Sequence, residues 1–297
     1  MLVVPKDEVI VISSNVPELD DGIEVYDKDK TYKTGNVVQT EDCIFESTKD
    51  ENTDAPIKEK TSLSWLYLGK TNRHKMFDEY MNTSTTYQDE LVYEFAVNDI
   101  DTICFFGLVA ESVKIEIFSE EELVYEEIRN TYTRFVSNWW EWTVQEGRYK
   151  KIVFFRNIPS FFGAKLKVTI SFHGSLASCS HLIFGKSLDF GITLVDPKPT
   201  SSIRNMVSKE KQSDGNVKTT NSRIYKRVTL NVLLDSSRVD EIQNFLEEHS
   251  LTPMLFIGVE KESMDMNSLT AFGFYKDFEQ PIGLNLSQYQ IEIEGII

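Results

Sequence analysis

Short segments with alternating apolar and polar residues limit most strongly what this chain can fold into. Residues 113–117 read VKIEI and residues 166–172 read LKVTISF, so every second side chain is apolar. This period of two is that of a strand with one buried face. Residues 152–155, IVFF, form a continuous apolar run that suits a strand covered on both faces. Such short segments, separated by turn-forming residues and without a long helical pattern, predict a mainly β fold.

The 297 residues are enough for two or three domains. Residues 1–61 are acidic and rich in turn-forming residues, and they predict a small β module that ends in an acidic linker. The alternating segments of residues 62–190 predict a jelly-roll-like β-sandwich. Residues 191–297 predict an α+β domain that contains a long basic arm, residues 198–230.

The predicted C-terminal domain has the order β-α-β-β-β. Its first strand follows from the alternating segment VTLNVLL, residues 228–234, and residues 235–237 supply cap side chains for a helix. One face of that helix carries Val239, Ile242, Phe245 and Leu246. The remaining strands are expected over residues 254–259, 269–278 and 288–297.

Composition and charge remove several classes of protein. The formal charge of −16, from 31 basic and 47 acidic residues, argues against general nucleic-acid binding, because phosphate contacts need clustered cations. No apolar stretch approaches the ~18 residues of a membrane span. The opening segment MLVVPKDEVIVISS lacks the basic start and long apolar run of a signal peptide, so none is expected.

The sequence shows no recognisable catalytic chemistry. Cys43, Cys104 and Cys179 form neither a CxxC pair nor a disulfide framework, and we expect buried thiols in a protein made in a reducing cytoplasm. No histidine pairs with another histidine or a cysteine at metal-ligand spacing, and no phosphate loop or nucleophile elbow is present. Pairs of neighbouring carboxylates read as solvated surface charges. We therefore expect no enzyme, no cofactor and no metal site.

The most aromatic segment is NWWEW, residues 138–142. In a strand, Trp140 and Trp142 would share a face and could form a sugar platform, with Asn138 and Glu141 as polar contacts. Tryptophans also dominate protein cores and subunit contacts, so the alternative is that these indoles fill the sandwich core or an interface.

The segment 198–230 carries eight basic residues against two acidic ones, inside an acidic chain. It predicts a solvated loop, an arm that docks on an acidic neighbouring subunit, or a nucleic-acid contact. Its length and the acidity of the other residues favour the arm. The candidate subunit contacts are Lys209, Lys211, Arg223 and Arg227.

Residues 65–78, WLYLGKTNRHKMFD, begin like a strand and then break at Gly69. Thr71 and Asn72 can bond their own backbone, and Arg73 could close the loop by a bidentate pair with Asp78. Met76 and Phe77 would then be inserted into the sandwich. This arrangement predicts a structural clasp, formed by Trp65, Gly69, Thr71, Asn72, Arg73, Met76, Phe77 and Asp78.

The same segment resembles one that recurs in structural proteins of tailed bacteriophages, where W-x-x-L-G-x-T-N-R is followed by M-F-D. Further segments are similar to the same family, namely residues 97–118, 157–171 and the C-terminal LTAFGFYKDF with QIEIEGI. Together they cover most of residues 62–297. His74 is a departure, since the family usually carries Trp there.

The N-terminal region looks like a degenerate form of the small chitin-binding-type module of chitinases. The positions that keep its spacing are Tyr32, Gly35, Val38, Phe45, Asn52, Pro56 and Trp65. That module usually presents surface tryptophans, and this segment has none before Trp65. The departure favours a structural role for the segment over polysaccharide binding.

The phage resemblance implies a non-enzymatic virion protein, a tail, collar or baseplate adaptor that scaffolds other tail proteins or fibres. It implies a symmetric homo-oligomer in the virion tail, made in the cytoplasm of the host bacterium. The net charge and the lack of a long apolar stretch add the expectation of no nucleic-acid partner and no membrane span. The alternative is a carbohydrate-binding receptor or adhesion protein of the virion that contacts a glycan of the host surface.

Overall fold

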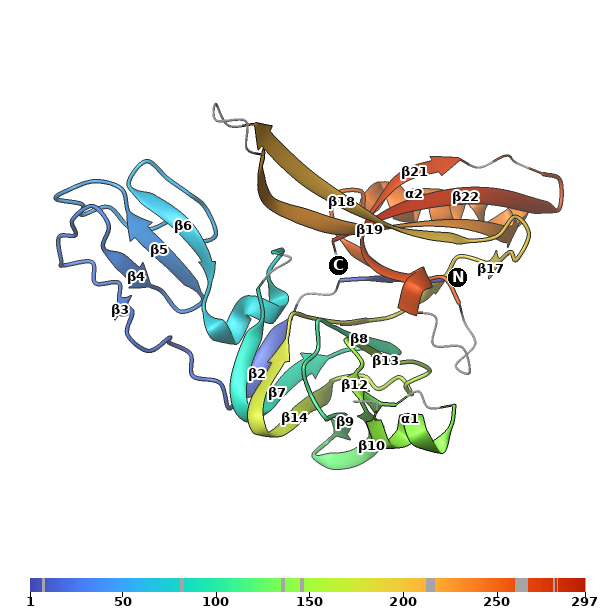
Figure 1. Cartoon of the computed structure of the whole chain (residues 1–297), viewed down its shortest axis with the longest axis horizontal. Coiled ribbons are helices and arrows are strands. Elements are labelled where there is room, and N and C mark those ends of the chain that lie inside the picture. The colour runs from blue at the N-terminus through green and yellow to red at the C-terminus, as the bar shows by residue number, and fades with distance from the viewer. Residues whose placement is uncertain are drawn as a thin grey trace. The chain divides into compact units, whose positions relative to one another are not determined.

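The computed structural model describes residues 1–6, 9–80, 83–134, 137–144, 147–211, 217–259, 267–279, 281 and 283–296, with side chains omitted for 205–211 and 217–224. The fold is mainly β, as the sequence predicted. The chain divides into two compact units (Figure 1). One, the split unit, consists of Met1–Asp7 with Ile183–Ile297, and the other, the inserted unit, is Glu8–Leu182.

This division differs from the predicted boundaries after residues 61 and 190. Strand β1, Leu2–Pro5, pairs antiparallel with β20, Met254–Ile257, and thus belongs to a sheet of the C-terminal region. Val3 and Val4 are fully buried there. The sequence of a four-residue strand does not indicate which sheet the strand joins. The sequence-based boundaries therefore placed β1 in the module of residues 1–61.

The split unit contains an eight-stranded sheet in the order β16-β1-β20-β21-β22-β19-β17, with β18 paired to β19. Its remaining strands are β16 Leu188–Asp189, β17 Ile192–Thr193, β18 Thr200–Lys211, β19 Val217–Asp235, β21 Thr270–Glu279 and β22 Leu286–Gly295. Its helical segments are η2 Ser236–Arg238, α2 Val239–Glu248 and η3 Asn267–Leu269. The predicted order β-α-β-β-β is therefore confirmed for β19, α2, β20, β21 and β22.

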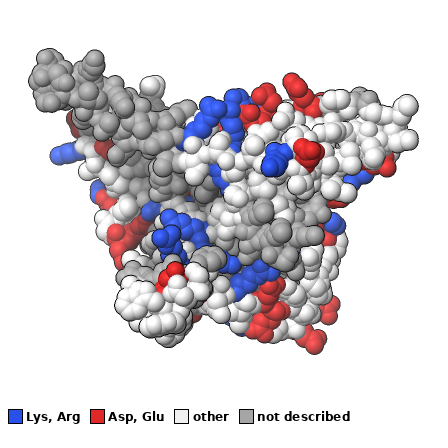
Figure 2. Space-filling view, turned by 45° about the vertical axis from the view of Figure 1, so that its right-hand side comes forward, with Lys and Arg blue, Asp and Glu red and all other residues white. Residues whose placement is uncertain are grey.

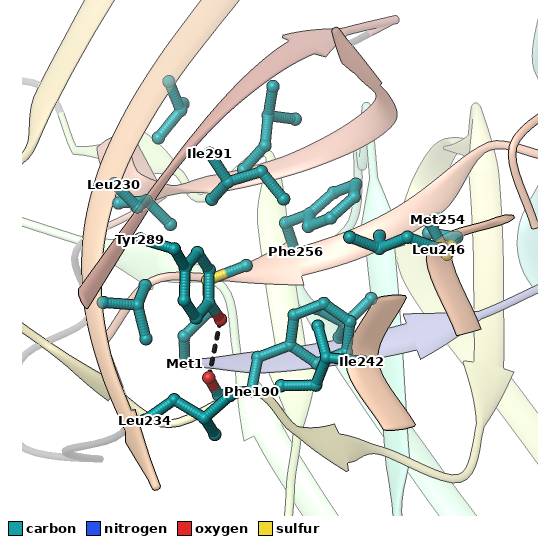
Figure 3. Close-up of a cluster of buried hydrophobic side chains, with 14 of the residues drawn as sticks. Met1, Phe190, Leu230, Leu234, Ile242, Leu246, Met254, Phe256, Tyr289 and Ile291 are labelled. Atoms are coloured by element: carbon teal, nitrogen blue, oxygen red, sulfur yellow. Dashed lines mark hydrogen bonds between the residues drawn. The ribbon is translucent and has the colours of Figure 1, made fainter. Parts of the chain in front are cut away.

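Helix α2 and the sheet enclose the core of the split unit (Figure 3). The apolar face of α2 buries Val239, Ile242 and Leu246, as the helical spacing predicted. Inside this core the hydroxyl of Tyr289 donates a hydrogen bond of 2.6 Å to the carbonyl oxygen of Phe190. A buried hydroxyl needs such a partner, and this bond joins β22 to the chain after β16.

The inserted unit contains most of the other strands. A five-stranded antiparallel sheet has the order β10-β9-β14-β7-β2, and a smaller sheet has the order β13-β8-β15. These strands are β2 Ile10–Ser14, β7 Thr85–Val97, β8 Thr102–Phe106, β9 Ser112–Ser119, β10 Glu122–Asn130, β13 Ile152–Phe155, β14 Ala164–Cys179 and β15 His181–Gly185, of which β15 continues past Leu182, the last residue of the unit. The side chains of β9 alternate between buried and half-buried, whereas all five of β8 are buried, so this β-rich fold is sandwich-like.

The N-terminal module of this unit is a four-stranded sheet in the order β3-β4-β5-β6. Its strands are β3 Glu24–Val25, β4 Val37–Gln39, β5 Cys43–Ser47 and β6 Trp65–Lys70. Its core contains Tyr32, Phe45 and Trp65. The indole N–H of Trp65 donates to the carbonyl oxygen of Asp54 at 2.8 Å. Sequence reasoning assigned β6 to the sandwich, but the strand completes this small sheet.

Candidate functional site

The predicted clasp begins inside β6. Gly69 has φ of +140° and lies where the register between β5 and β6 shifts next to Ile44 and Phe45. Because this backbone conformation is one that L side chains rarely adopt, glycine is favoured at the bend. The chain therefore bends within the strand at Gly69, and the strand continues to Lys70.

The 3-10 turn η1, Asn72–Phe77, follows β6 and carries most of the clasp. The side chain of Asn72 donates to the carbonyl oxygen of Thr86 at 2.8 Å and accepts from the N–H of Thr86 at 3.1 Å. The prediction that Asn72 bonds its own loop is therefore wrong. Its side-chain amide instead forms the two hydrogen bonds to Thr86 that the backbone of a paired strand would form. These bonds hold η1 against β7.

The predicted pair between Arg73 and Asp78 was also wrong. A guanidinium nitrogen of Arg73 lies 3.2 Å from a carboxylate oxygen of Glu18. The carboxylate of Asp78, which is 3% exposed, accepts from the N–H of Tyr80 and the hydroxyl of Thr83, both at 2.8 Å. Arg73 thus fastens η1 to the chain after β2, while Asp78 organises the turn that follows.

Met76 and Phe77 pack against β7, as the sequence predicted. Met76 is 1% exposed, and its N–H donates to the hydroxyl of Thr85 at 3.0 Å. The ring of Phe77 lies edge-on to Tyr93 and Phe95, with centroids 6.0 and 5.7 Å apart. Aromatic rings prefer this arrangement, so both side chains fix η1 on the sheet.

Thr71 and His74 complete the clasp. Thr71 is fully buried, and its hydroxyl lies 3.1 Å from Nδ1 of His74. Burial lowers the pKa of His74, so the imidazole is neutral at pH 7. The contacts of Asn72, Arg73 and Met76 each hold η1 to another segment of the chain, as the contacts of a structural clasp would.

A cluster of possible ligand atoms lies beside the clasp, on the N-terminal module. Single ligand atoms of Asp42, Cys43 and Glu59 lie within 4.8 Å of one another. The ammonium of Lys70 lies 2.5 Å from Glu59 and 3.6 Å from Asp42. Burial raises the pKa of Cys43 to about 11, so the thiol keeps its proton. Because the ammonium of Lys70 already balances the charge of the Asp42 and Glu59 carboxylates, we describe this group as an ion-pair cluster.

The aromatic segment is helical from Trp139 onward and does not form the strand that the sugar platform requires. Helix α1, Trp139–Val144, lies between the short paired strands β11, Tyr132–Thr133, and β12, Arg148–Tyr149. Trp139, Trp140 and Trp142 are 78%, 62% and 61% exposed. The alternative that these indoles fill the sandwich core is therefore wrong as well.

The polar residues of the predicted sugar platform start this helix. The side-chain oxygen of Asn138 accepts from the N–H of Glu141 at 2.9 Å. The carboxylate of Glu141 accepts from the N–H and the hydroxyl of Ser137, at 2.8 and 2.6 Å. Asn138 thus acts as the N-cap residue, and Glu141 reaches back to the residue before it, in a variant of the capping box. The guanidinium of Arg134 lies 5.4 Å from the ring centroid of Trp142 and covers part of that indole.

The basic segment 198–230 is neither a loop nor a connection, because most of it belongs to strands β18 and β19. Arg227 is part of their sheet, where it pairs with Glu292 of β22 at 3.1 Å. This ion pair lies within its own unit, so Arg227 is less available for the predicted subunit contact. The side chains of Lys209, Lys211 and Arg223 lie outside the described residues. Basic and acidic side chains are interspersed on the visible face in Figure 2.

No model of a known protein family matches the sequence, and no curated protein matches it. Among the described helices, none combines the length and the apolar character needed to cross a membrane, and α2 has only 10 residues.

Sequence reasoning overlooked residues at both candidate sites. Asp20 and Glu18 bind the clasp from more than fifty positions away, and no local pattern points to them. Trp139 was left out of the sugar platform because a strand would have turned it to the other face. The signal that identifies the helix was present, since Asn138 and Glu141 have the spacing of a helix start.

Proposed function

We propose that this chain is a non-enzymatic structural protein of a tailed-bacteriophage virion, an adaptor that joins tail proteins or fibres and assembles as a symmetric homo-oligomer. The observation that carries the proposal is the long hairpin of β18 and β19. The resemblance of residues 62–297 to bacteriophage tail proteins supports the proposal that the hairpin contacts other proteins of a tail.

The hairpin extends well beyond the sheet that holds it (Figure 1). Strands β18 and β19 pair from Thr200 and Thr229 outward to Lys211 and Val217. Pairing of β19 with β22 begins only at Lys226. Beyond Lys226, outward to the described end of the hairpin, β18 and β19 therefore pair only with each other among the described strands.

A two-stranded ribbon by itself is marginally stable in water, because it buries little apolar surface. Its edges also leave backbone N–H and C=O groups without a partner strand. A neighbouring molecule that covers the ribbon supplies both the missing contact surface and the missing partners. The ribbon therefore has the form of an assembly arm.

The charges of the arm suit a neighbouring copy. The segment 198–230 has eight basic and two acidic residues, in a chain whose formal charge is −16. Opposite charges on two surfaces steer their association and fix their register. Arg227 is less available for such a contact because it pairs with Glu292. The remaining candidates are Lys209, Lys211 and Arg223.

Charge reversal tests the arm. The triple variant Lys209→Glu, Lys211→Glu and Arg223→Glu is expected to remain a folded monomer but to lose assembly, measured by sedimentation and by incorporation into particles. The control reverses three exposed lysines elsewhere, Lys28, Lys33 and Lys165, and is expected to assemble. Normal incorporation of the arm variant would refute the arm.

The virion location has its own test. Quantitative mass spectrometry of gradient-purified phage particles measures the number of copies of this chain relative to the capsid protein. A fixed ratio that corresponds to a closed cyclic assembly supports the adaptor, since such assemblies contain small whole numbers of subunits. Absence from the particles contradicts it.

Carbohydrate binding by the virion is a second candidate function. It is favoured by the exposure of Trp139, Trp140 and Trp142, which are 78%, 62% and 61% accessible. Indole rings stack on the C–H faces of sugars, and an adaptor can also contact the cell surface.

A further inference from the structure

The aromatic tip of the inserted unit, defined as α1 with its flanking strands β11 and β12, is an unusual surface. None of the six residues of α1 is buried. Tryptophan side chains are on average well buried in folded proteins, and here three of the four in the chain are exposed. Covering these indoles would remove a large apolar area from water, so the tip has the composition of a binding surface.

The rings of the tip point in different directions. Trp139 and Trp140 have centroids 6.0 Å apart and an interplanar angle of 85°. Trp142 is already covered on one side by the guanidinium of Arg134. The two free indoles thus offer perpendicular faces, and these can stack on separate sugar rings of a polymer that turns around the helix.

An ionised carboxylate lies among these indoles. Hydrogen bonds from the side chain and N–H of Ser137 lower the pKa of Glu141, so it stays charged at neutral pH. Moving a charge into the hydrocarbon of a bilayer or into an apolar protein pocket is costly. A glycan avoids this cost, because it offers C–H faces to the indoles and leaves the carboxylate in water.

The base of the tip is basic although the chain is acidic. Arg148 and Lys151 are exposed, and neither forms an ion pair with another described residue. In the pairing of β11 with β12, Arg148 lies opposite Thr133, and Arg134 is the residue that follows Thr133 in the sequence. A guanidinium matches the geometry of a carboxylate or phosphate, so this side of the tip favours an acidic ligand.

We infer that the aromatic tip binds an acidic polysaccharide. Trp139 and Trp140 stack on its sugar rings, and Arg148 and Lys151 bind its carboxylate or phosphate groups. The inference rests on the second function proposed above, which it deepens by naming the class of glycan. It also replaces the residues expected from the sequence, because Asn138 and Glu141 are used to cap α1.

Tryptophan fluorescence of the full chain follows this binding directly. The fourth tryptophan, Trp65, is fully buried in the N-terminal module, so a change in emission on binding comes from the tip. Polygalacturonate is the acidic probe, and its fully methyl-esterified form is the matched neutral polymer. Glycerol-phosphate teichoic acid tests phosphate as the acidic group, and phosphatidylglycerol vesicles test a membrane surface.

We expect saturable binding to at least one acidic polymer and at least tenfold weaker binding to the neutral one. Binding to the acidic polymer should weaken as salt is added, since exposed charges are screened. The variant Trp139→Ala with Trp140→Ala should lose binding by tenfold or more, and Arg148→Gln with Lys151→Gln should lose it by several-fold. The charge-matched control, Lys33→Gln with Lys165→Gln, should bind like the original chain.

The other outcomes overturn the inference in distinguishable ways. Equal binding to the neutral polymer would leave carbohydrate binding in place and remove the acidic class. No binding to any polymer would remove the tip as a glycan site, together with the second candidate function. Binding to vesicles but to no polymer, lost in the double tryptophan variant, would assign the tip to a membrane surface.

Discussion

The backbone N–H of Asn72 donates to both carboxylate oxygens of Asp20, at 2.9 and 3.1 Å, across 52 positions of sequence. Asn72 is the first residue of η1, where backbone N–H groups have no partner within the turn. Asp20 is itself held by Gln39, whose side-chain oxygen accepts from its N–H at 2.7 Å. This contact ties together the chain after β2, the small sheet and the clasp.

Removal of the Asp20 carboxylate should therefore loosen the clasp. The variant Asp20→Ala leaves the N–H of Asn72 without its partner, and we expect the free energy of unfolding to fall by about 1–2 kcal/mol. Urea denaturation followed by tryptophan fluorescence measures this, because all four tryptophans lie in the inserted unit. Asp21→Ala is the control, since Asp21 is exposed and adjacent. Equal midpoints for the two variants would contradict the role of Asp20.

The hydrogen bond between Tyr289 and Phe190 gives a second prediction, in the split unit. The variant Tyr289→Phe keeps the ring in the core but leaves a buried carbonyl oxygen unpaired, which should cost about 1–3 kcal/mol of stability. Tyr275→Phe makes the same change at a half-buried hydroxyl that donates to Leu246 at 3.1 Å, and it should cost less. Circular dichroism melts compare the two variants, and a larger loss at Tyr275 would contradict the assignment.

Much of the fold follows from local periodicity. The alternation over residues 113–117 and 228–234 identifies strands whose apolar side chains are buried, and the helical spacing identifies the inward face of α2. Both patterns lie within one element, so they can be read without knowledge of its neighbours. Met76 and Phe77 do pack on the sheet as predicted, although the loop closure from which that prediction followed is wrong.

The candidate sites were less predictable because they depend on distant partners or on very short elements. Local reasoning paired Arg73 with Asp78, the nearest acid that closes a loop, while the actual partner Glu18 is 55 positions away. Helix α1 has six residues, too few for a helical period, and three are aromatic, which favours a strand on propensity. Its capping box outweighs that preference.

Strand β1 gives a third prediction, which concerns how the chain is divided. Val3 is fully buried in the core of the split unit, although most of that unit follows residue 182. The variant Val3→Asp places an unpaired charge in this core and should unfold it, at a cost of about 3 kcal/mol or more. Limited proteolysis should then cleave within residues 183–297, while tryptophan emission reports an intact inserted unit. Ile10→Asp, at a position 57% exposed, is the control and should resist cleavage.

The three buried thiols give the last prediction, which concerns pH. Burial raises the pKa of Cys43 to about 11 and of Cys179 to about 12, and it raises that of Cys104 well above the ordinary value of 9.0. The unfolded chain releases these protons near pH 9, whereas the folded chain retains them. Stability contributed by the thiols is thus present below pH 9 and is lost as the pH rises toward 11 and 12.

A single substitution separates the effect of one thiol from other titrations. Lys226, whose pKa burial lowers to about 8, acts in the opposite direction, because its neutral form is favoured in the folded chain. The variant Cys179→Ala keeps that contribution and removes one thiol. Urea denaturation measures the free energy of unfolding at each pH. Between pH 8.5 and 10 we expect this free energy to fall by about 1 kcal/mol less in the variant than in the original chain. Parallel pH profiles would show that Cys179 retains no extra proton on folding, which would contradict its burial at the end of β14, beside the carbonyl oxygens of Phe106 and His181.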